Sequence, residues 1–397
     1  MRNAETRKYG ENIAKKGGTG FSVATSFEKE FLDRIEGKGV IEIYGRMEDD
    51  GYGGGRHRFL VPKIGRRRLE RHVADAREKG IGFNYLLNAA DGGTGDAVTP
   101  SGFRRLRRFL SWLVEIGVES VTVVSPFLLR VVKEHTPLKV RVSVFARADD
   151  ERKVASWLDL GASIVVLDSM LVNRDPKRLA RLAKKFDSNT LEIFVNNRCE
   201  LGCAWAPCHA KDIGEASRNL IPRPDACYFQ CQAEFARDPA RLMMQDWIRP
   251  EDLHLYEELG YRRFKIAGRG CSTERLVQRV QAYSSRRFDG NLLDLLARGN
   301  VHLDPRTAFS TFFLSGLRHL RLLRQASRTA DRIEKDLWIE NRALDGYLEA
   351  VFRKGGCLPE KCFRCSLCRE WGRNAVRFPE EYPEALEAFQ RRLVLGE

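Results

Sequence analysis

Cysteines are the residues of this chain whose type and spacing most directly indicate chemistry. Five of the ten lie between residues 199 and 231, at Cys199, Cys203, Cys208, Cys227 and Cys231. Thiolates are soft donors that suit zinc and iron–sulfur clusters, and one centre takes four of them. The set contains two C-x3-C pairs, whereas structural zinc sites more often use C-x2-C, so the spacing favours a cluster. Buried free thiols would poorly explain five cysteines in a polar segment.

A second set of four cysteines lies near the C-terminus. Cys357, Cys362, Cys365 and Cys368 are separated by four, two and two residues, in a segment that also contains Arg364. Four thiols so close together form a complete local ligand set. The C-x2-C-x2-C part is typical of cluster-binding loops, and the leading spacing also suits a zinc knuckle. We therefore expect a second cluster or a zinc ion here.

The elements that position these cysteines follow from an alternation of short apolar runs and helical patterns. The expected strands are Val40–Tyr44, Ile81–Asn88, Val121–Ser125, Val140–Phe145, Ile164–Asp168, Leu191–Asn196 and Phe264–Ala267, with an eighth at Val301–Leu303. Alternation at these intervals is typical of a parallel sheet, and eight strands favour closure. The predicted fold is α/β, a TIM-like (β/α)8 barrel with a helical, cysteine-rich C-terminal extension. Its expected parts are a lead-in at 1–37, the barrel at 38–303 with a cysteine-rich insertion at 199–231, and the extension at 304–397.

Function in such a barrel resides at the C-terminal ends of the strands, and the sixth run delivers its cysteines there. Lys265 and Arg269 lie at the end of the seventh run, so we expect them to orient an anionic oxygen donor or substrate beside the metal. An ion pair between Lys265 and Asp168, or another strand-end carboxylate, is the structural alternative. Asp168 and His209, the neighbour of Cys208, complete the candidate catalytic residues.

The composition of the chain indicates its cellular location and the kind of partner it binds. The 397 residues carry a net charge of +14, which makes an anionic small molecule or RNA a plausible partner, although an arginine-rich proteome would explain the charge as well. Arg321 and Arg324 lie on a basic face of an expected helix. The N-terminus lacks a signal-peptide pattern and no apolar run is long enough to span a membrane, so we expect a cytoplasmic protein. The glycine-rich segment 51–56 predicts either an anion-binding loop or a loop over the barrel mouth.

Several strings resemble the peptidase U32 family, the collagenase-like peptidase group. They are Asn-Asn-Arg-Cys-Glu-Leu-Gly-Cys at 196–203 with His209 beyond it, the pair Cys227 and Cys231, the segment 247–256, and Phe-Lys-Ile-Ala-Gly-Arg at 264–269. The resemblance implies a TIM-like barrel that holds a 4Fe–4S cluster on four cysteines. It also implies an oxygen-independent hydroxylation of an RNA base or a small aromatic substrate, and a possible protein partner of the same family.

The chain departs from the family pattern because Cys199 and Cys208 both lie near Cys203. We expect the quartet Cys199, Cys203, Cys227 and Cys231, with Cys208 as the substitute ligand. A U32-type peptidase is the second hypothesis, although the sequence contains neither His-Glu-x-x-His nor Gly-x-Ser-x-Gly. A non-catalytic RNA-binding metal protein is the third.

Overall fold

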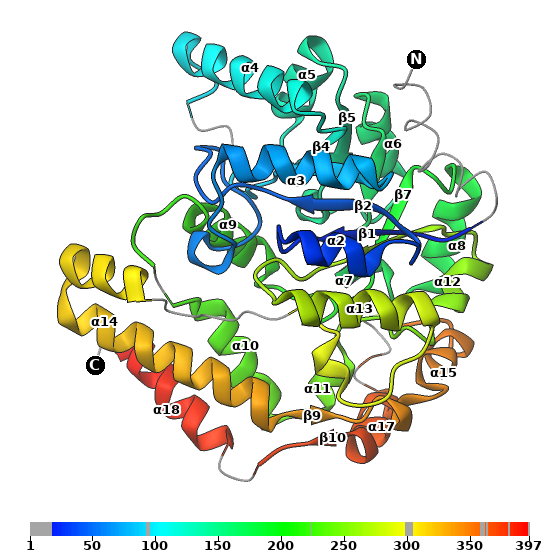
Figure 1. Cartoon of the computed structure of the whole chain (residues 1–397). Coiled ribbons are helices and arrows are strands. Elements are labelled where there is room, and N and C mark those ends of the chain that lie inside the picture. The colour runs from blue at the N-terminus through cyan, green and yellow to red at the C-terminus, as the bar shows by residue number, and fades with distance from the viewer. Residues whose placement is uncertain are drawn as a thin grey trace.

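The barrel is closed by eight parallel strands. A computed structural model describes residues 18–92, 96–222, 224–297, 305–357, 362, 364–379 and 382–395. The strands, paired in chain order, are β1 (Gly20–Ala24), β2 (Val40–Gly45), β3 (Gly82–Leu87), β4 (Ser120–Val123), β5 (Lys139–Val142), β6 (Ile164–Val166), β7 (Leu191–Phe194) and β8 (Arg263–Ile266), and β8 returns to β1 (Figure 1). The predicted TIM-like (β/α)8 fold is therefore confirmed.

The seven clear apolar runs of the sequence all form barrel strands, but the remaining strand was misplaced. It is β1, which lies inside the segment 1–37 where the sequence predicts only a lead-in, and it pairs with β2 and β8. β1 was overlooked because it is short and its central residue, Ser22, is polar. The strand expected at Val301–Leu303 lies outside the described residues.

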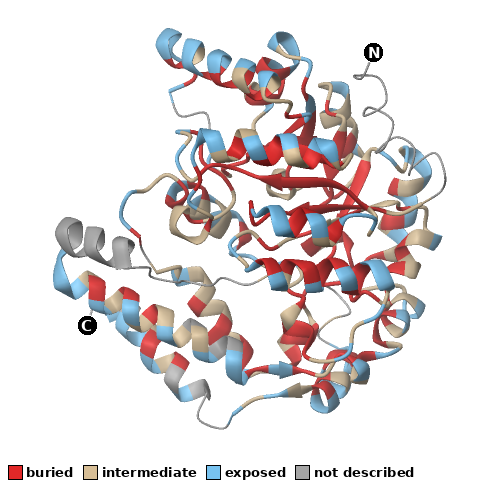
Figure 2. Ribbon diagram, viewed as in Figure 1, coloured by how far each residue is buried: buried red, intermediate tan, exposed pale blue. Residues whose placement is uncertain are grey.

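Helices surround the barrel and connect its strands. They are α2 (Lys29–Ile35), α3 (Arg66–Glu78), α4 (Pro100–Glu115), α5 (Pro126–His135), α6 (Glu151–Asp159), α7 (Ser169–Val172), α8 (Pro176–Lys185), α9 (Ala206–Ala216), α10 (Ala226–Arg237), α11 (Ala240–Met243), α12 (Leu253–Glu258) and α13 (Thr273–Ser285). Local sequence sets several of their starts: Thr99 and Ser125 are side-chain caps that precede a proline in the first turn. Figure 2 shows the buried residues along the strands and the inward helix faces.

The barrel interior contains a network of buried charges. Arg141 on β5 bridges two carboxylates, with Nη2 at 2.9 Å from Glu42 and Nη1 at 2.8 Å from Glu192. Lys265 Nζ lies 3.9 Å from the other oxygen of Glu192 and 4.1 Å from the centre of the Tyr44 ring. Burial opposes ionisation of Glu192, but Arg141 and Lys265 outweigh it and lower its pKa to about 2. Matched cations and carboxylates thus stabilise a charged interior.

The C-terminal part packs against the barrel and the cysteine-bearing helices. It comprises α14 (Pro305–Asp336), which is broken at Gly316, β9 (Trp338–Ile339), α15 (Tyr347–Arg353), α17 (Leu367–Ala375), β10 (Val376–Arg377) and α18 (Tyr382–Leu395). The rings of Phe389 on α18 and Phe229 on α10 lie 4.6 Å apart. The extension is therefore packed on the helix that carries Cys227 and Cys231.

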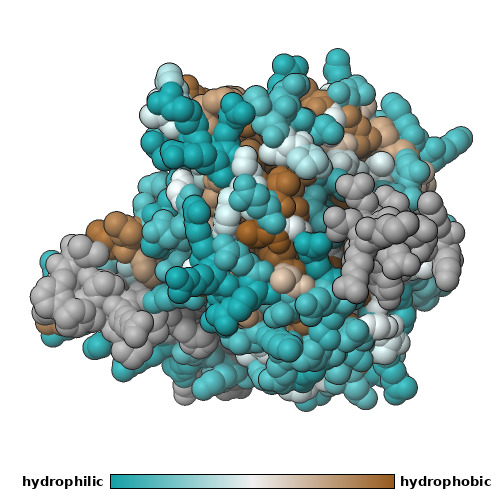
Figure 3. Space-filling view, turned by 45° about the horizontal axis from the view of Figure 1, so that its top comes forward, coloured by the Kyte–Doolittle hydropathy of each residue, from teal (hydrophilic) through white to brown (hydrophobic). Residues whose placement is uncertain are grey.

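The molecular surface is mainly hydrophilic. Figure 3 shows one face on which polar side chains predominate around a hydrophobic area near the centre. Among the described residues, no helix has the length and apolar character needed to cross a bilayer.

Candidate functional site

The first cysteine loop is anchored to the barrel by asparagine and aspartate side chains. Asn196, just after β7, donates to the carbonyl oxygens of Ala267 at 3.0 Å and Leu295 at 2.8 Å. The backbone N–H of Cys199 donates to Asp246 Oδ1 at 2.9 Å, and Asn197 donates to Asp246 Oδ2 at 2.7 Å. Asp246 is fully buried. These bonds fix the start of the loop at the C-terminal end of β7, as expected.

Four thiols of this region lie close enough to influence one another's ionisation. Burial raises the pKa of Cys199, and the neighbouring Asp246, Cys231 and Cys203 raise it further. Burial also raises the pKa of Cys231 to about 12, with contributions from Cys203 and Cys227. Thiols with raised pKa values are poor nucleophiles as free groups, but a bound metal deprotonates them outright. The donor set therefore fits a thiolate-bound metal centre.

Cys208 lies at the edge of this set. Burial raises the pKa of Cys227 to about 12, and a hydrogen bond with Cys208 contributes to the shift. Cys208 itself is exposed, and its Sγ donates to the carbonyl oxygen of Trp205 at 3.0 Å. The structure thus places Cys208 beside Cys227, where it can act as the substitute ligand considered from the sequence.

The second cysteine set also comes together. Burial raises the pKa of Cys357 to about 11, with Cys368, Cys362 and Cys365 contributing, while the guanidinium of Arg174 opposes the rise. The backbone N–H of Cys357 donates to the carbonyl oxygen of Arg174 at 2.7 Å. This set is therefore attached to the barrel through Arg174, which lies two residues before the start of α8.

Glu200 lies near one thiol of each set, because its charge raises the pKa of both Cys231 and Cys362. Arg241 holds this carboxylate with Nη2 at 2.7 Å and Nε at 3.0 Å.

Cationic side chains gather at the C-terminal ends of the strands. Arg269 is partly buried, and its Nη2 donates to the carbonyl oxygen of Gly55 at 2.8 Å. Arg46 forms a two-point ion pair with Asp50. The Nη1 atoms of Arg46 and Arg269 are buried without a hydrogen-bond partner among the described residues. Two guanidinium groups that each keep one N–H group without a partner in the described residues can donate hydrogen bonds to an anionic ligand.

The glycine-rich loop covers this cationic region and does not offer its amides to an anion. The N–H groups of Gly54 and Gly55 donate to Ser217 Oγ at 2.9 Å and Asn88 Oδ1 at 3.2 Å. A Cβ on Gly54 would lie 2.8 Å from Arg46 Cδ and 3.5 Å from Arg269 Nη1. Glycine thus permits close contact between the loop and the two arginines.

The candidate catalytic residues Lys265, Asp168 and His209 lie in three different parts of the molecule. Lys265 faces Glu192 inside the barrel, and burial lowers its pKa to about 8. The ion-pair partner of Asp168 is Arg147, at 2.7 Å, so the alternative pairing of Asp168 with Lys265 is wrong. Burial raises the pKa of Asp168 to about 6, against the effect of Arg147.

His209 lies on α9 and contacts a carboxylate that sequence reasoning missed. Its Nε2 is 2.9 Å from Oδ2 of Asp225, which caps α10. Burial lowers the pKa of His209, but the hydrogen bond and the charge of Asp225 outweigh it and raise the pKa overall. Asp246 was missed as well, since nothing in its local sequence marks it as the anchor of Cys199.

Three comparisons with known proteins bear on the chain. The family model described as Peptidase family U32 matches residues 56–291. An uncharacterized protease of Methanocaldococcus jannaschii is 28% identical over 310 residues, covering 78% of this chain and 81% of that protein.

Among solved structures, the U32 peptidase Mk0906 is similar with a TM-score of 0.47 and 20% identity, covering 63% of this chain and 93% of that one. The carboxyl transferase domain of Rhizobium etli pyruvate carboxylase with 3-hydroxypyruvate has a TM-score of 0.37 and 10% identity, covering 99% of this chain and 63% of that one.

Proposed function

Because the chain belongs to peptidase family U32, we propose that it is an iron–sulfur protein of that family that takes part in an oxygen-independent hydroxylation. The observation that carries the proposal is that Cys231 lies near enough to Cys199, Cys203 and Cys227 for the charges of these thiols to interact. These residues would hold a 4Fe–4S cluster, which would supply one-electron redox chemistry. The substrate class is an RNA base or a small aromatic compound, with oxygen supplied by an anionic donor.

The barrel mouth supports binding of an anionic donor or substrate. Arg46 and Arg269 each keep one buried Nη1 without a hydrogen-bond partner among the described residues. Asn196 connects the cysteine loop to Ala267, two residues before Arg269. The anion-binding groups and the proposed cluster therefore belong to adjacent strand ends. Lys265, whose pKa burial lowers to about 8, would add a positive charge when protonated.

We expect Lys265→Met and Arg269→Lys to reduce turnover by roughly 10²-fold. The first removes a positive charge, and the second replaces a planar guanidinium, which can donate two parallel hydrogen bonds to an anion, by a single ammonium group. Both variants should keep the iron content of the wild type, since neither residue is a proposed ligand. The measurement is an anaerobic hydroxylation assay with RNA and with small aromatic acids. Lys79→Met, on a surface lysine paired with Glu36, is the matched control and should keep activity.

Wild-type turnover in both site variants would contradict the anion-binding role. Loss of iron from either variant would instead make Lys265 or Arg269 a structural residue of the metal centre.

Peptidase activity is the second candidate, and one observation beyond the relatives' names favours it. His209 is oriented by Asp225, the arrangement that a general base requires, and it follows Cys208 directly. However, the Sγ of Cys208 donates to Trp205, and no described contact joins this thiol to the imidazole of His209. Peptide hydrolysis by the wild type that His209→Gln abolishes would favour this candidate over the hydroxylase.

The C-terminal cysteines are proposed to bind a second cluster or a zinc ion. Cys365→Ala should lower the metal content of this site while the visible spectrum of the first cluster remains. This residue is exposed, so its replacement should not disturb the fold. Deleting the extension would be a poorer test, because α18 packs against the cysteine-bearing α10 through Phe389 and Phe229. Ser366→Ala is the control. Equal metal content in the wild type and Cys365→Ala would contradict the site.

We propose RNA as one of the two substrate classes. Arg321 and Arg324 are exposed on α14, where they can contact phosphates. If they do, RNA affinity should fall steeply with salt, and reversing both charges should weaken binding and make the salt dependence shallower by about two counterions. Electrophoretic titrations at several salt concentrations measure both quantities. Identical salt dependence in the wild type and the double variant would exclude these arginines from the RNA contact.

A further inference from the structure

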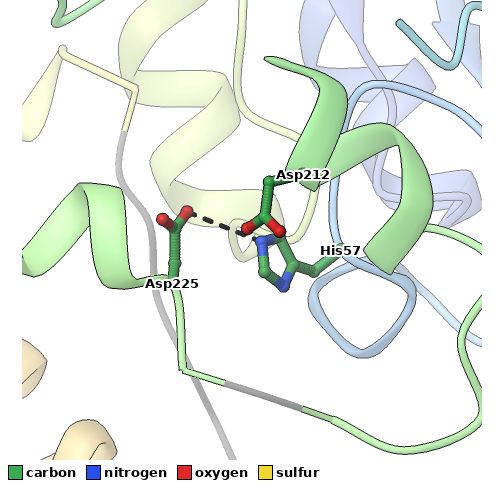
Figure 4. Close-up of side chains that lie close together, drawn as sticks. All are labelled: His57, Asp212 and Asp225. Carbon is green, nitrogen blue, oxygen red and sulfur yellow. Dashed lines mark ion pairs between the residues drawn. The ribbon is translucent and has the colours of Figure 1, made fainter. Parts of the chain in front are cut away.

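A cluster of one histidine and two aspartates lies outside the cysteine sets. His57 comes from the loop after β2, Asp212 from α9, and Asp225 from the start of α10. One ligand atom from each lies within 4.8 Å of the other two. Figure 4 shows the three side chains pointing toward one another from their separate segments. Residues distant in the sequence thus converge with ligand-type atoms.

His57 presents a buried nitrogen to this cluster. The residue is 7% exposed, and its Nε2 makes no hydrogen bond with the described residues. This nitrogen faces Asp225 Oδ2 at 3.5 Å, which is longer than an ordinary hydrogen bond. Buried polar atoms normally make a full hydrogen bond, so an imidazole nitrogen that lies beside two carboxylates and makes only this long contact points to a ligand between them.

Asp225 is held in place by groups outside the cluster. Its Oδ1 accepts from the backbone N–H of Tyr228 at 2.9 Å, and its Oδ2 lies 2.9 Å from Nε2 of His209. Carboxylates that bind metals are typically oriented by such second contacts. Asp225 is therefore pre-positioned on the α10 side of the cluster.

We propose that His57, Asp212 and Asp225 bind one divalent first-row transition metal ion, separate from the thiolate centres. One neutral imidazole and two carboxylates balance a charge of +2 and leave further positions for water or a ligand. Ca²⁺ takes six to eight oxygen ligands, whereas an imidazole suits transition metals, so this ligand set favours a transition metal over Ca²⁺.

The ion would join the glycine-rich loop to the two helices that carry cysteines. His57 directly follows Arg56 at the end of that loop, while Asp212 shares α9 with Cys208 and Asp225 precedes Cys227 by two residues. The bound metal would thereby fix the loop over the barrel mouth relative to the proposed cluster.

The test is a titration of the anaerobically purified full chain with Mn²⁺, followed by the electron paramagnetic resonance signal of the free ion. Mn²⁺ suits carboxylate ligands, whereas thiolates select softer metals, so the cysteine sets contribute little. We expect about one Mn²⁺ per chain. His57→Gln and Asp212→Asn should each weaken binding at least about tenfold, as loss of a ligand requires. His254→Gln, on the partly exposed histidine of α12, is the matched control and should bind as the wild type.

Circular dichroism of each variant separates loss of binding from loss of folding, and Asp212→Asn keeps the size of the side chain. Cys199→Ala should bind Mn²⁺ as tightly as the wild type, which distinguishes this site from the first cysteine set. No binding by the wild type at about millimolar Mn²⁺ would overturn the proposal. Equal affinity in the wild type, His57→Gln and Asp212→Asn would overturn it as well. Neither result would affect the proposed thiolate cluster.

Discussion

Replacing Cys231 by alanine should remove one cluster from the anaerobically purified protein, a loss of about four iron and four sulfide per chain. Cys231 is the most informative cysteine of the first set, because Cys203 and Cys227 both contribute to its raised pKa and it contributes to that of Cys199. Removing a thiolate from this position leaves three ligands, which rarely retain a cluster fully. Iron and sulfide analysis together with the visible spectrum measures the loss.

Two further variants sharpen this result. Cys271→Ala is the matched control, since Cys271 contacts Arg279 and belongs to neither cysteine set, and it should keep full iron content. Cys208→Ala tests the choice of quartet: retained iron favours Cys227 as the fourth ligand, and lost iron favours Cys208. Full iron content in Cys231→Ala would exclude Cys231 from the cluster.

Replacing Arg141 by methionine should lower the free energy of unfolding by about 3–5 kcal/mol, the usual cost of removing one partner of a buried ion pair. The side chain of Arg141 is only 2% exposed, and it bridges Glu42 and Glu192 inside the barrel. Its loss leaves two buried carboxylates without their ion-pair partner, and the remaining nearby cations are Lys265, 3.9 Å from Glu192, and Arg263, whose charge also lowers the pKa of Glu192. Urea unfolding at neutral pH measures the change.

The pH dependence of the free energy of unfolding of Arg141→Met shows whether the buried carboxylates cause the destabilisation. Without Arg141, burial should raise the pKa of Glu192, so protonation at low pH would remove the buried charge. The destabilisation should therefore shrink as the pH falls from 7 toward 5. Arg34→Met is the matched control: it breaks a surface pair with Glu30 and should cost less than about 1 kcal/mol. An equally small effect for Arg141→Met would contradict the role assigned to the interior charges.

Much of the barrel could be predicted because seven of its strands are buried, and buried strands appear in the sequence as short apolar runs. The charged interior could not, since Glu42, Arg141 and Glu192 are single polar residues inside separate strands, and only the register between strands brings them together. The register between strands also explains why Lys265 pairs with Glu192. Strand pairing sets Phe194 opposite Lys265, so Glu192, two residues earlier on β7, faces the lysine in place of Asp168.

The cysteines of the site could be predicted because their type and spacing are visible in the sequence. Their supporting contacts could not. Asp246 binds the backbone of Cys199, which lies 47 residues earlier in the chain. His57 contacts Asp225 from the loop after β2, whereas Asp225 lies after β7. Such long-range polar contacts depend on tertiary packing, which leaves no local pattern to read.

The most direct test of the account is the metal content of the wild-type protein purified without oxygen. Iron, acid-labile sulfide and zinc should be determined together, with a visible spectrum before and after reduction by dithionite. The account predicts at least four iron and four sulfide per chain, with a broad visible absorption that bleaches on reduction. Stoichiometric zinc at both cysteine sets, with neither iron nor sulfide, would contradict it.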